Sequence, residues 1–105
     1  MNRFYVVMAT SVLLALSGGA AFGEGSASVG KEKSEDCADC HGPDGAGDGD
    51  TIPALAGMPV EQFRQAMADY RSGKRKASPM MIKQSHRLSD RDIEDLAAYY
   101  ASLKP

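Results

Sequence analysis

Both cysteines of this 105-residue chain and one of its two histidines lie within seven consecutive residues, DCADCHG, at positions 36–42. Cysteines at this spacing serve three chemistries: a zinc site, a dithiol or disulfide, and covalent attachment of a cofactor. A zinc site needs four ligands, so Cys37, Cys40 and His41 would have to recruit His86. The adjacent Cys40 and His41 would also have difficulty reaching one tetrahedral ion, which makes zinc a poor interpretation.

A thioredoxin-like dithiol belongs in a βαβ setting, which this sequence does not predict, and a plain disulfide would leave His41 without a role. The pattern C-x-x-C-H is the signature of c-type haem attachment. Two thiols three residues apart on a helical turn can reach the two vinyl groups of one porphyrin, and the next histidine can place a ring nitrogen under the iron. We therefore predict that Cys37 and Cys40 bind one haem c and that His41 ligates its iron.

The N-terminus has the layout of a secretory signal peptide. Arg3 precedes an apolar run at 6–16, and small residues follow up to Gly23. Roughly 11 apolar residues fall well short of the ~20 that span a bilayer, so we expect no stable membrane insertion. The prediction is a removed signal peptide at 1–23 and a periplasmic domain at 24–105.

A domain of this size is marginal unless a cofactor, metal or disulfide supports its core. The formal net charge of −2 gives no reason to expect nucleic-acid binding. The charges are unevenly distributed, however: residues 24–50 contain eight acids and two lysines, and residues 64–91 contain eight basic residues and two acids. This pattern is typical either of ordinary solvated surface or of a dipolar molecule that is steered onto charged partners.

Helical patterns dominate the sequence, and no segment alternates with period two, so we predict an all-α domain. A short polar helix is expected at 29–36 and a glycine-rich loop at 42–50. Pro59 is expected at the first position of a helix that ends at Gly73, and residues 74–88 are expected to be irregular around Pro79. A capped final helix follows Ser89, and the predicted buried stripes are Val60, Phe63, Met67 and Tyr70, then Ile93, Leu96, Ala97, Tyr100 and Leu103.

The chain resembles the class I cytochrome c family, and more closely its small bacterial members and the haem subunits of flavocytochrome c sulfide dehydrogenases. The resemblance runs from GKEKSEDCADCHG to LSDRDIEDLAAYYASL. It implies a small cytochrome c fold of about four short helices around one covalently bound haem. It also implies a role for Pro53, twelve residues after His41, whose carbonyl would accept a hydrogen bond from that ligand.

The resemblance further implies a methionine on the other face of the iron. Met1 and Met8 fall in the predicted signal peptide, and Met58 is too close in sequence to the His41 side. Met67 lies on a predicted buried stripe, which leaves Met80 and Met81. In an extended segment only one of this pair could face the iron. Related cytochromes place the ligand seven residues before the apolar residue that precedes the last helical cap; counting back from Leu88 selects Met81, with Met80 as the alternative. His86 would instead give a bis-histidine centre.

The leading hypothesis is a periplasmic one-electron carrier that exchanges electrons with redox protein partners and is not an enzyme on its own. The alternative is the haem c subunit of a flavoprotein sulfide dehydrogenase, which would pass electrons from a flavin subunit to an acceptor. A third class, a gas-binding haem protein, would need an open iron position. Haem propionates require donors, and the basic segment offers Arg71, Lys74, Arg75 and Lys76, with Arg75 as the named candidate.

Overall fold

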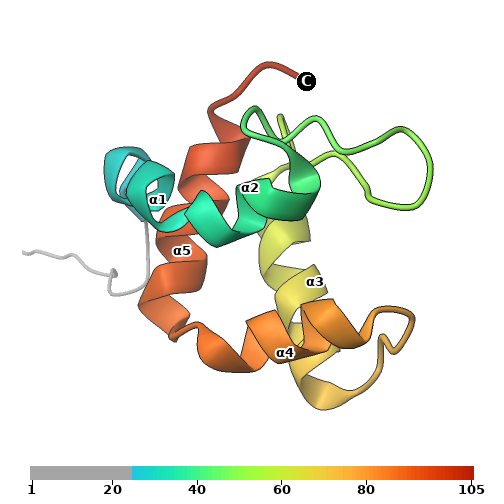
Figure 1. Cartoon of the computed structure of the whole chain (residues 1–105). Coiled ribbons are helices and arrows are strands. Elements are labelled where there is room, and N and C mark those ends of the chain that lie inside the picture. Colours follow the sequence, from blue (N-terminus) through green and yellow to red (C-terminus); the bar gives the residue numbers. More distant parts are fainter. Residues whose placement is uncertain (1–24) are drawn as a thin grey trace, which may run out of the picture.

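The computed structural model describes residues 25–105, which form five helices and contain no strand (Figure 1). The predicted all-α fold is confirmed, whereas the predicted signal peptide lies outside the described residues. None of the described helices is long and apolar enough to span a lipid bilayer. The helices are α1 (Ala27–Lys33), α2 (Glu35–His41), α3 (Val60–Ser72), α4 (Pro79–Arg87) and α5 (Asp90–Ala101).

The polar N-terminal segment forms two short helices where the sequence predicted one. The Ser34 hydroxyl donates to the Lys31 carbonyl at 2.7 Å, and the Ser34 backbone adopts φ −83° and ψ 0°. A serine that hydrogen-bonds the preceding turn competes with helix continuation. The break lets α2 begin a new direction, so the cysteine motif lies on its own helix.

The core is built around α3 and α5, as their apolar stripes predicted. Phe63, Met67 and Tyr70 of α3 are buried, and so are Leu96 and Tyr100 of α5. The rings of Phe63 and Tyr100 stack with centroids 5.9 Å apart. At the end of α3, Gly73 takes a left-handed conformation with φ 83°. Pro59 is the residue before α3 rather than its first residue.

The prediction of an irregular segment at 74–88 is wrong over most of its length, because Pro79–Arg87 is α4. Pro79 occupies the first turn, where a missing N–H costs nothing. The Ser78 hydroxyl accepts a hydrogen bond from the Met81 backbone N–H at 3.2 Å and caps the helix. The proline therefore starts a helix here instead of interrupting one.

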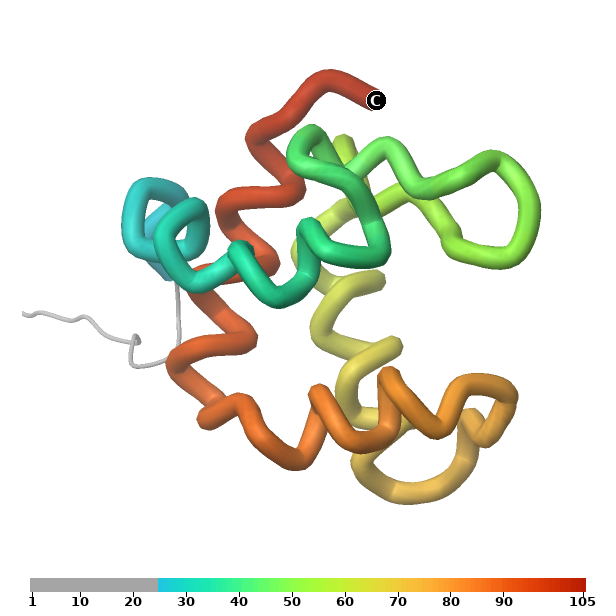
Figure 2. Tube along the Cα trace, in the orientation of Figure 1, coloured from blue at the N-terminus to red at the C-terminus, as the bar shows by residue number. Residues whose placement is uncertain are grey.

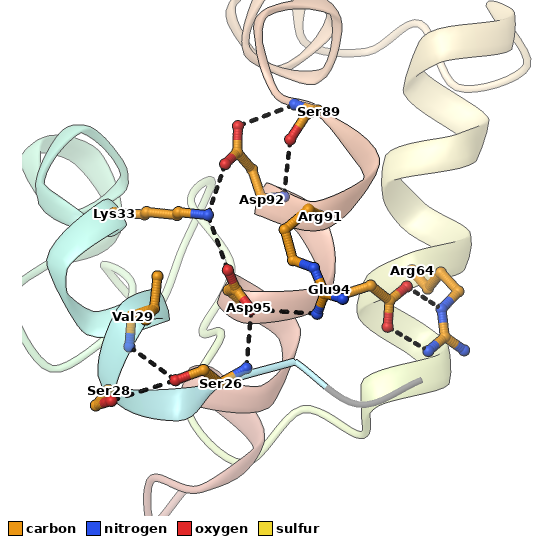
Figure 3. A network of polar contacts seen from close by, with 10 residues as sticks. All are labelled: Ser26, Ser28, Val29, Lys33, Arg64, Ser89, Arg91, Asp92, Glu94 and Asp95. Atoms are coloured by element: carbon orange, nitrogen blue, oxygen red, sulfur yellow. Dashed lines mark hydrogen bonds and ion pairs between the residues drawn. The ribbon is translucent and has the colours of Figure 1, made fainter. Parts of the chain in front are cut away.

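The junction of α1 with α5 depends on a glycine and a polar network (Figure 3). A Cβ on Gly30 would lie 2.0 Å from the Asp95 carbonyl oxygen, so the two helices pack at a distance that only glycine permits. Lys33 Nζ contacts Asp92 at 2.7 Å and Asp95 at 2.8 Å, and the Ser26 N–H donates to Asp95 at 2.8 Å. The Asp95 carboxylate is buried, and Lys33 and the Ser26 N–H bind its oxygens.

Candidate haem-binding site

Helix α2 carries the two cysteines and the histidine of the motif. Cys37 and Cys40 are three residues apart, so they lie on one side of the helix about one turn from each other. His41 is the last residue of α2 and is 6% exposed, whereas Cys40 is exposed and Cys37 half-buried. Gly42 ends the helix with φ 91°, which turns the chain into the following loop.

The imidazole of His41 is oriented by a backbone carbonyl. Its Nδ1 lies 2.8 Å from the carbonyl oxygen of Pro53. A carbonyl can only accept, so Nδ1 carries the proton and donates, and in the neutral ring the lone pair resides on Nε2. This is the tautomer and the buried setting in which a histidine binds a metal ion.

The loop between α2 and α3 holds Pro53 in place through residues that the sequence analysis did not single out. Gly47 donates its N–H to the His41 carbonyl at 2.8 Å. A Cβ on Gly47 would lie 2.4 Å from the Ile52 carbonyl oxygen, and its φ is 70°. Asp48 Oδ1 accepts from the N–H groups of Asp50 and Ile52, both at 2.8 Å. The repeated Gly-Asp pairs of the loop were the available signal, because such pairs form turns of this kind.

The competing chemistries for the motif receive no support from this geometry. Within residues 25–105, no three side chains of the metal-binding types His, Cys, Asp and Glu gather into a possible ion site. Cys37 and Cys40 are not joined to each other by a disulfide. Burial raises the pKa of the Cys37 thiol, partly opposed by its hydrogen bond with Tyr100. A reactive dithiol requires a lowered thiol pKa, so the environment of Cys37 is unsuited to disulfide exchange.

The two candidate methionines differ in exposure because both lie in the first turn of α4. Successive residues of a helix point about 100° apart, so the expected alternation of an extended segment does not apply. Met81 is half-buried against the core, whereas Met80 is 59% exposed. Met67 is buried in the core at 4% exposure, and His86 is exposed.

Several apolar side chains that pack on the core, including those of Cys37 on α2 and Met81 and Ile82 on α4, are only partly covered by protein. The helices α2 and α4 make no close backbone contact with each other, and α4 runs below α2 in Figure 2, but the side chains of Arg87 and Asp36 pair at 3.1 Å. A large apolar group attached to α2 would cover such side chains, so the lining fits a porphyrin. The partly buried side chains that pack on the core are Cys37, Leu55, Met58, Val60, Met81, Ile82 and Leu103.

Two of the suggested propionate donors have other partners. Arg71 donates Nε to the Ser85 carbonyl at 2.8 Å and pairs through Nη1 with Asp90 at 2.7 Å. Arg75 is exposed, and its guanidinium lies 4.9 Å from the ring centroid of Tyr70. The geometry therefore assigns Arg71 to holding helices together.

An all-helical fold, a C-x-x-C-H helix and an oriented histidine define a small c-type haem protein. Residues 25–104 match the sequence model of the family described as Cytochrome c. The chain is 39% identical over 80 residues to cytochrome c-554(548) of Halomonas halodenitrificans, covering 74% of this chain and 96% of that protein. It is 38% identical over 105 residues to cytochrome c4 of Pseudomonas aeruginosa, covering 99% of this chain and 50% of that protein.

Comparison with a solved structure and with a further sequence relative points to the same family. The cytochrome c4 structure of Acidithiobacillus ferrooxidans superposes with a TM-score of 0.70 at 28% identity, covering 76% of this chain and 51% of that one. A protein called thiosulfate dehydrogenase electron acceptor, from Stutzerimonas stutzeri, is 33% identical over 70 residues, covering 65% of this chain and 32% of that protein. This chain thus spans almost all of cytochrome c-554(548) and about half of the cytochrome c4 proteins.

The chain belongs to the cytochrome c family and is a class I bacterial c-type cytochrome. The family binds haem c covalently, and the two cysteines of this chain, Cys37 and Cys40, fit that attachment. One motif means one haem in the described domain. The chain is accordingly an electron-transfer protein, whereas the similarity to flavocytochrome subunits receives no separate support.

Proposed function

We propose that this chain is a periplasmic one-electron carrier whose single haem c is attached to Cys37 and Cys40 and ligated by His41 and Met81. The observation that carries the proposal is the 2.8 Å hydrogen bond from His41 Nδ1 to the Pro53 carbonyl. It holds a buried imidazole in the one orientation and tautomer that leave Nε2 able to bind iron.

The residues of the chain have separate tasks in this proposal. Haem c, when bound, supplies an iron that gains and loses one electron. His41 is held by the backbone, so its ring keeps its orientation when the iron changes charge. Met81 offers a thioether, a soft ligand that favours the ferrous state and raises the reduction potential. Half-buried apolar side chains keep water from the site.

Met81 is favoured over Met80 by its burial. A ligand sulfur must leave water and lie under the protein surface, and Met81 already packs against the core. Met80 is 59% exposed and would have to turn inward. The adjacent positions still make Met80 the variant that any ligand experiment must include.

Export and removal of residues 1–23 are part of the proposal. Gly25 and Ser26, which follow the proposed cleavage site, are packed on α5: a Cβ on Gly25 would lie 2.0 Å from the Glu94 carbonyl oxygen, and the Ser26 N–H is bonded to Asp95. A cut beyond Gly25 would remove these contacts. Intact-mass measurement of protein exported to the periplasm should give a chain that begins near Glu24.

The charge distribution supports an acidic redox partner. Between residues 71 and 89 the chain contains six basic residues and no carboxylate. We define the cationic face as Lys74, Arg75, Lys76 and Lys83, which are all exposed and flank the exposed Met80. Charged rims of this kind raise association rates at low salt. Changing Lys74 and Lys83 to glutamate should slow electron exchange with anionic hexacyanoferrate and leave exchange with cationic hexaammineruthenium equal or faster.

A second candidate is the haem subunit of an oxidoreductase, including the flavoprotein sulfide dehydrogenase suggested by the sequence. The relative named as the electron acceptor of thiosulfate dehydrogenase favours this candidate. Flavin or substrate chemistry would then reside in a partner chain. Co-purification of a stoichiometric enzyme subunit from native extract would support it, and a monomer in gel filtration would favour the free carrier.

Redox titration of protein exported with haem maturation intact tests the proposal directly. We expect one electron per chain, a six-coordinate spectrum in both oxidation states, and no change when carbon monoxide is added to the ferrous form. A carbon monoxide complex at neutral pH would show an open or labile iron position and would favour the gas-binding class.

A further inference from the structure

Helix α4 carries Met81, yet the protein core holds it weakly. It has nine residues, fewer than an isolated helix needs to persist in water. Ser85 is its one residue in the buried class. Its backbone packs closely against α3 and against no other described helix. The position of α4 must therefore depend on a few specific contacts.

Arg71, in the last turn of α3, supplies the strongest of these contacts. Its Nε donates to the Ser85 carbonyl at 2.8 Å, and its Nη2 donates to the Leu88 carbonyl. Carbonyls at the end of a helix lack partners within the helix, and a cation there also complements the helix dipole. The remaining nitrogen, Nη1, pairs with Asp90 at the start of α5. One guanidinium thus joins α3 to the end of α4 and the start of α5.

We propose that Arg71 is a positioning residue for the Met81 ligand. Arg71 fixes the C-terminal end of α4, where the exposed Arg87 also pairs with Asp36 of α2 at 3.1 Å. At the N-terminal end the Ser78 hydroxyl only caps the helix itself, by accepting from the Met81 N–H at 3.2 Å. The inference rests on the proposed function in one respect, namely that Met81 is the axial ligand. Arg71 acts through the backbone of α4 and sets how firmly the sulfur stays bound.

The consequence is a sixth ligand whose retention depends on a contact at the far end of its helix. If α4 is released from Arg71, the sulfur leaves the iron for a larger fraction of the time. An external ligand can bind the iron only in the fraction of molecules from which the sulfur has left. When that fraction grows, the external ligand binds with higher apparent affinity. Imidazole is a suitable competitor for the ferric protein.

The test compares wild-type holoprotein with Arg71→Gln, which cannot span both carbonyls. The readouts are the apparent affinity for imidazole and the ferric absorption band at the red end of the visible that reports sulfur ligation. We expect imidazole to bind about tenfold more tightly, the change expected from losing one hydrogen bond of a charged group. Arg71→Lys keeps the positive charge but cannot donate to both carbonyls at once, so it should give an intermediate increase in imidazole affinity.

Arg64→Gln is the matched control on the same helix. Arg64 binds Glu94 of α5 through Nε and Nη2, both at 2.7 Å, and its side chain is 35% exposed against 30% for Arg71 (Figure 3). This variant should lower the thermal midpoint without changing imidazole affinity. Asp90→Asn, which spares both carbonyl contacts, should change the affinity less than twofold.

The possible results distinguish a failure of the Arg71 positioning role from a failure of the Met81 ligand assignment. Equal imidazole affinities for Arg71→Gln and wild type would overturn the positioning role, and so would equal increases for Arg71→Gln and Arg64→Gln. Persistence of the ferric sulfur band in Met81→Ala would instead show that the ligand assignment is wrong. If Arg71→Gln does not accumulate as holoprotein, Arg71→Lys decides by the same two readouts.

Discussion

The helix that supplies His41 and the helix that supplies Met81 are held in contrasting ways. His41 is 6% exposed, and its ring is bonded to a backbone carbonyl in a loop that returns to the helix end. Met81 is half-buried on a short helix that Ser78 caps and that Arg71 joins to α3 at its other end. In the first arrangement, the backbone of the neighbouring loop holds the side chain of the proposed ligand His41. The second would leave the proposed ligand Met81 with an attachment that single side-chain changes can weaken.

The largest expected effect separates haem attachment from ligation. The double variant Cys37→Ala with Cys40→Ala should lose all covalently bound haem, because no thiol remains in the chain. A haem stain after denaturing electrophoresis measures this directly. Met81→Ala should stain like wild type, since α4 has no part in attachment. Haem retained by the double variant would remove the basis for assigning the attachment to α2.

The next effect lies on the α4 side. Met81→Ala should lose the ferric sulfur band and gain carbon monoxide binding in the ferrous form, with haem still attached. Met80→Ala should keep the band, because its exposed side chain contributes little to the site. Spectra of the two variants under identical export conditions provide the comparison. The reverse result would exchange the roles of the two methionines.

A packing change away from α4 should weaken the fold without loosening Met81 selectively. Gly30→Ala places a methyl group against the Asp95 backbone, and overpacking at a helix contact costs about 3 kcal/mol. Chemical denaturation should show this loss, and Glu32→Ala on the exposed side of α1 should change stability by less than about 0.5 kcal/mol. Imidazole affinity of folded Gly30→Ala should match wild type. A large increase would mean that α4 depends on the whole fold rather than on its own attachments.

The smallest effect concerns acid stability at the same α1 and α5 junction. The hydrogen bond from Lys33 is the main cause that lowers the Asp92 pKa from 3.8 to about 2, and the hydrogen bond from the Ser89 N–H is the second. Lys33 also lowers the pKa of the buried Asp95. Groups with a lowered folded-state pKa stabilise the fold above their unfolded value, and this contribution is lost as pH falls from about 4 towards 2. Lys33→Met should therefore flatten the fall in stability over this range, as measured by denaturation at several pH values. A slope equal to wild type would show that the network does not couple to folding.

Sequence patterns predicted the elements with strong periodicity or strong caps. The stripe of α3, the Ser89 cap of α5 and the glycine-rich loop were all expected, because each depends on neighbours along the chain. The break at Ser34 was missed, since a hydroxyl that bonds its own helix leaves no periodic trace. Helix α4 was missed because Pro79 was taken as an interruption, although proline is also favoured in a first turn.

By itself, the sequence determined the haem chemistry and the candidate ligands, because the spacing of Cys37, Cys40 and His41 on one helix is a local property. Family resemblance added Pro53 and the choice between Met80 and Met81. Tertiary structure alone decided how these residues are held: the Gly47 contact behind Pro53, the glycine contact of α1 with α5, and the attachment of α4 by Arg71. The last two join residues distant along the chain, and a single sequence carries no periodic or spacing signal for contacts that arise only when the helices pack. The Gly47 contact lies within one loop and depends on the path that the loop takes.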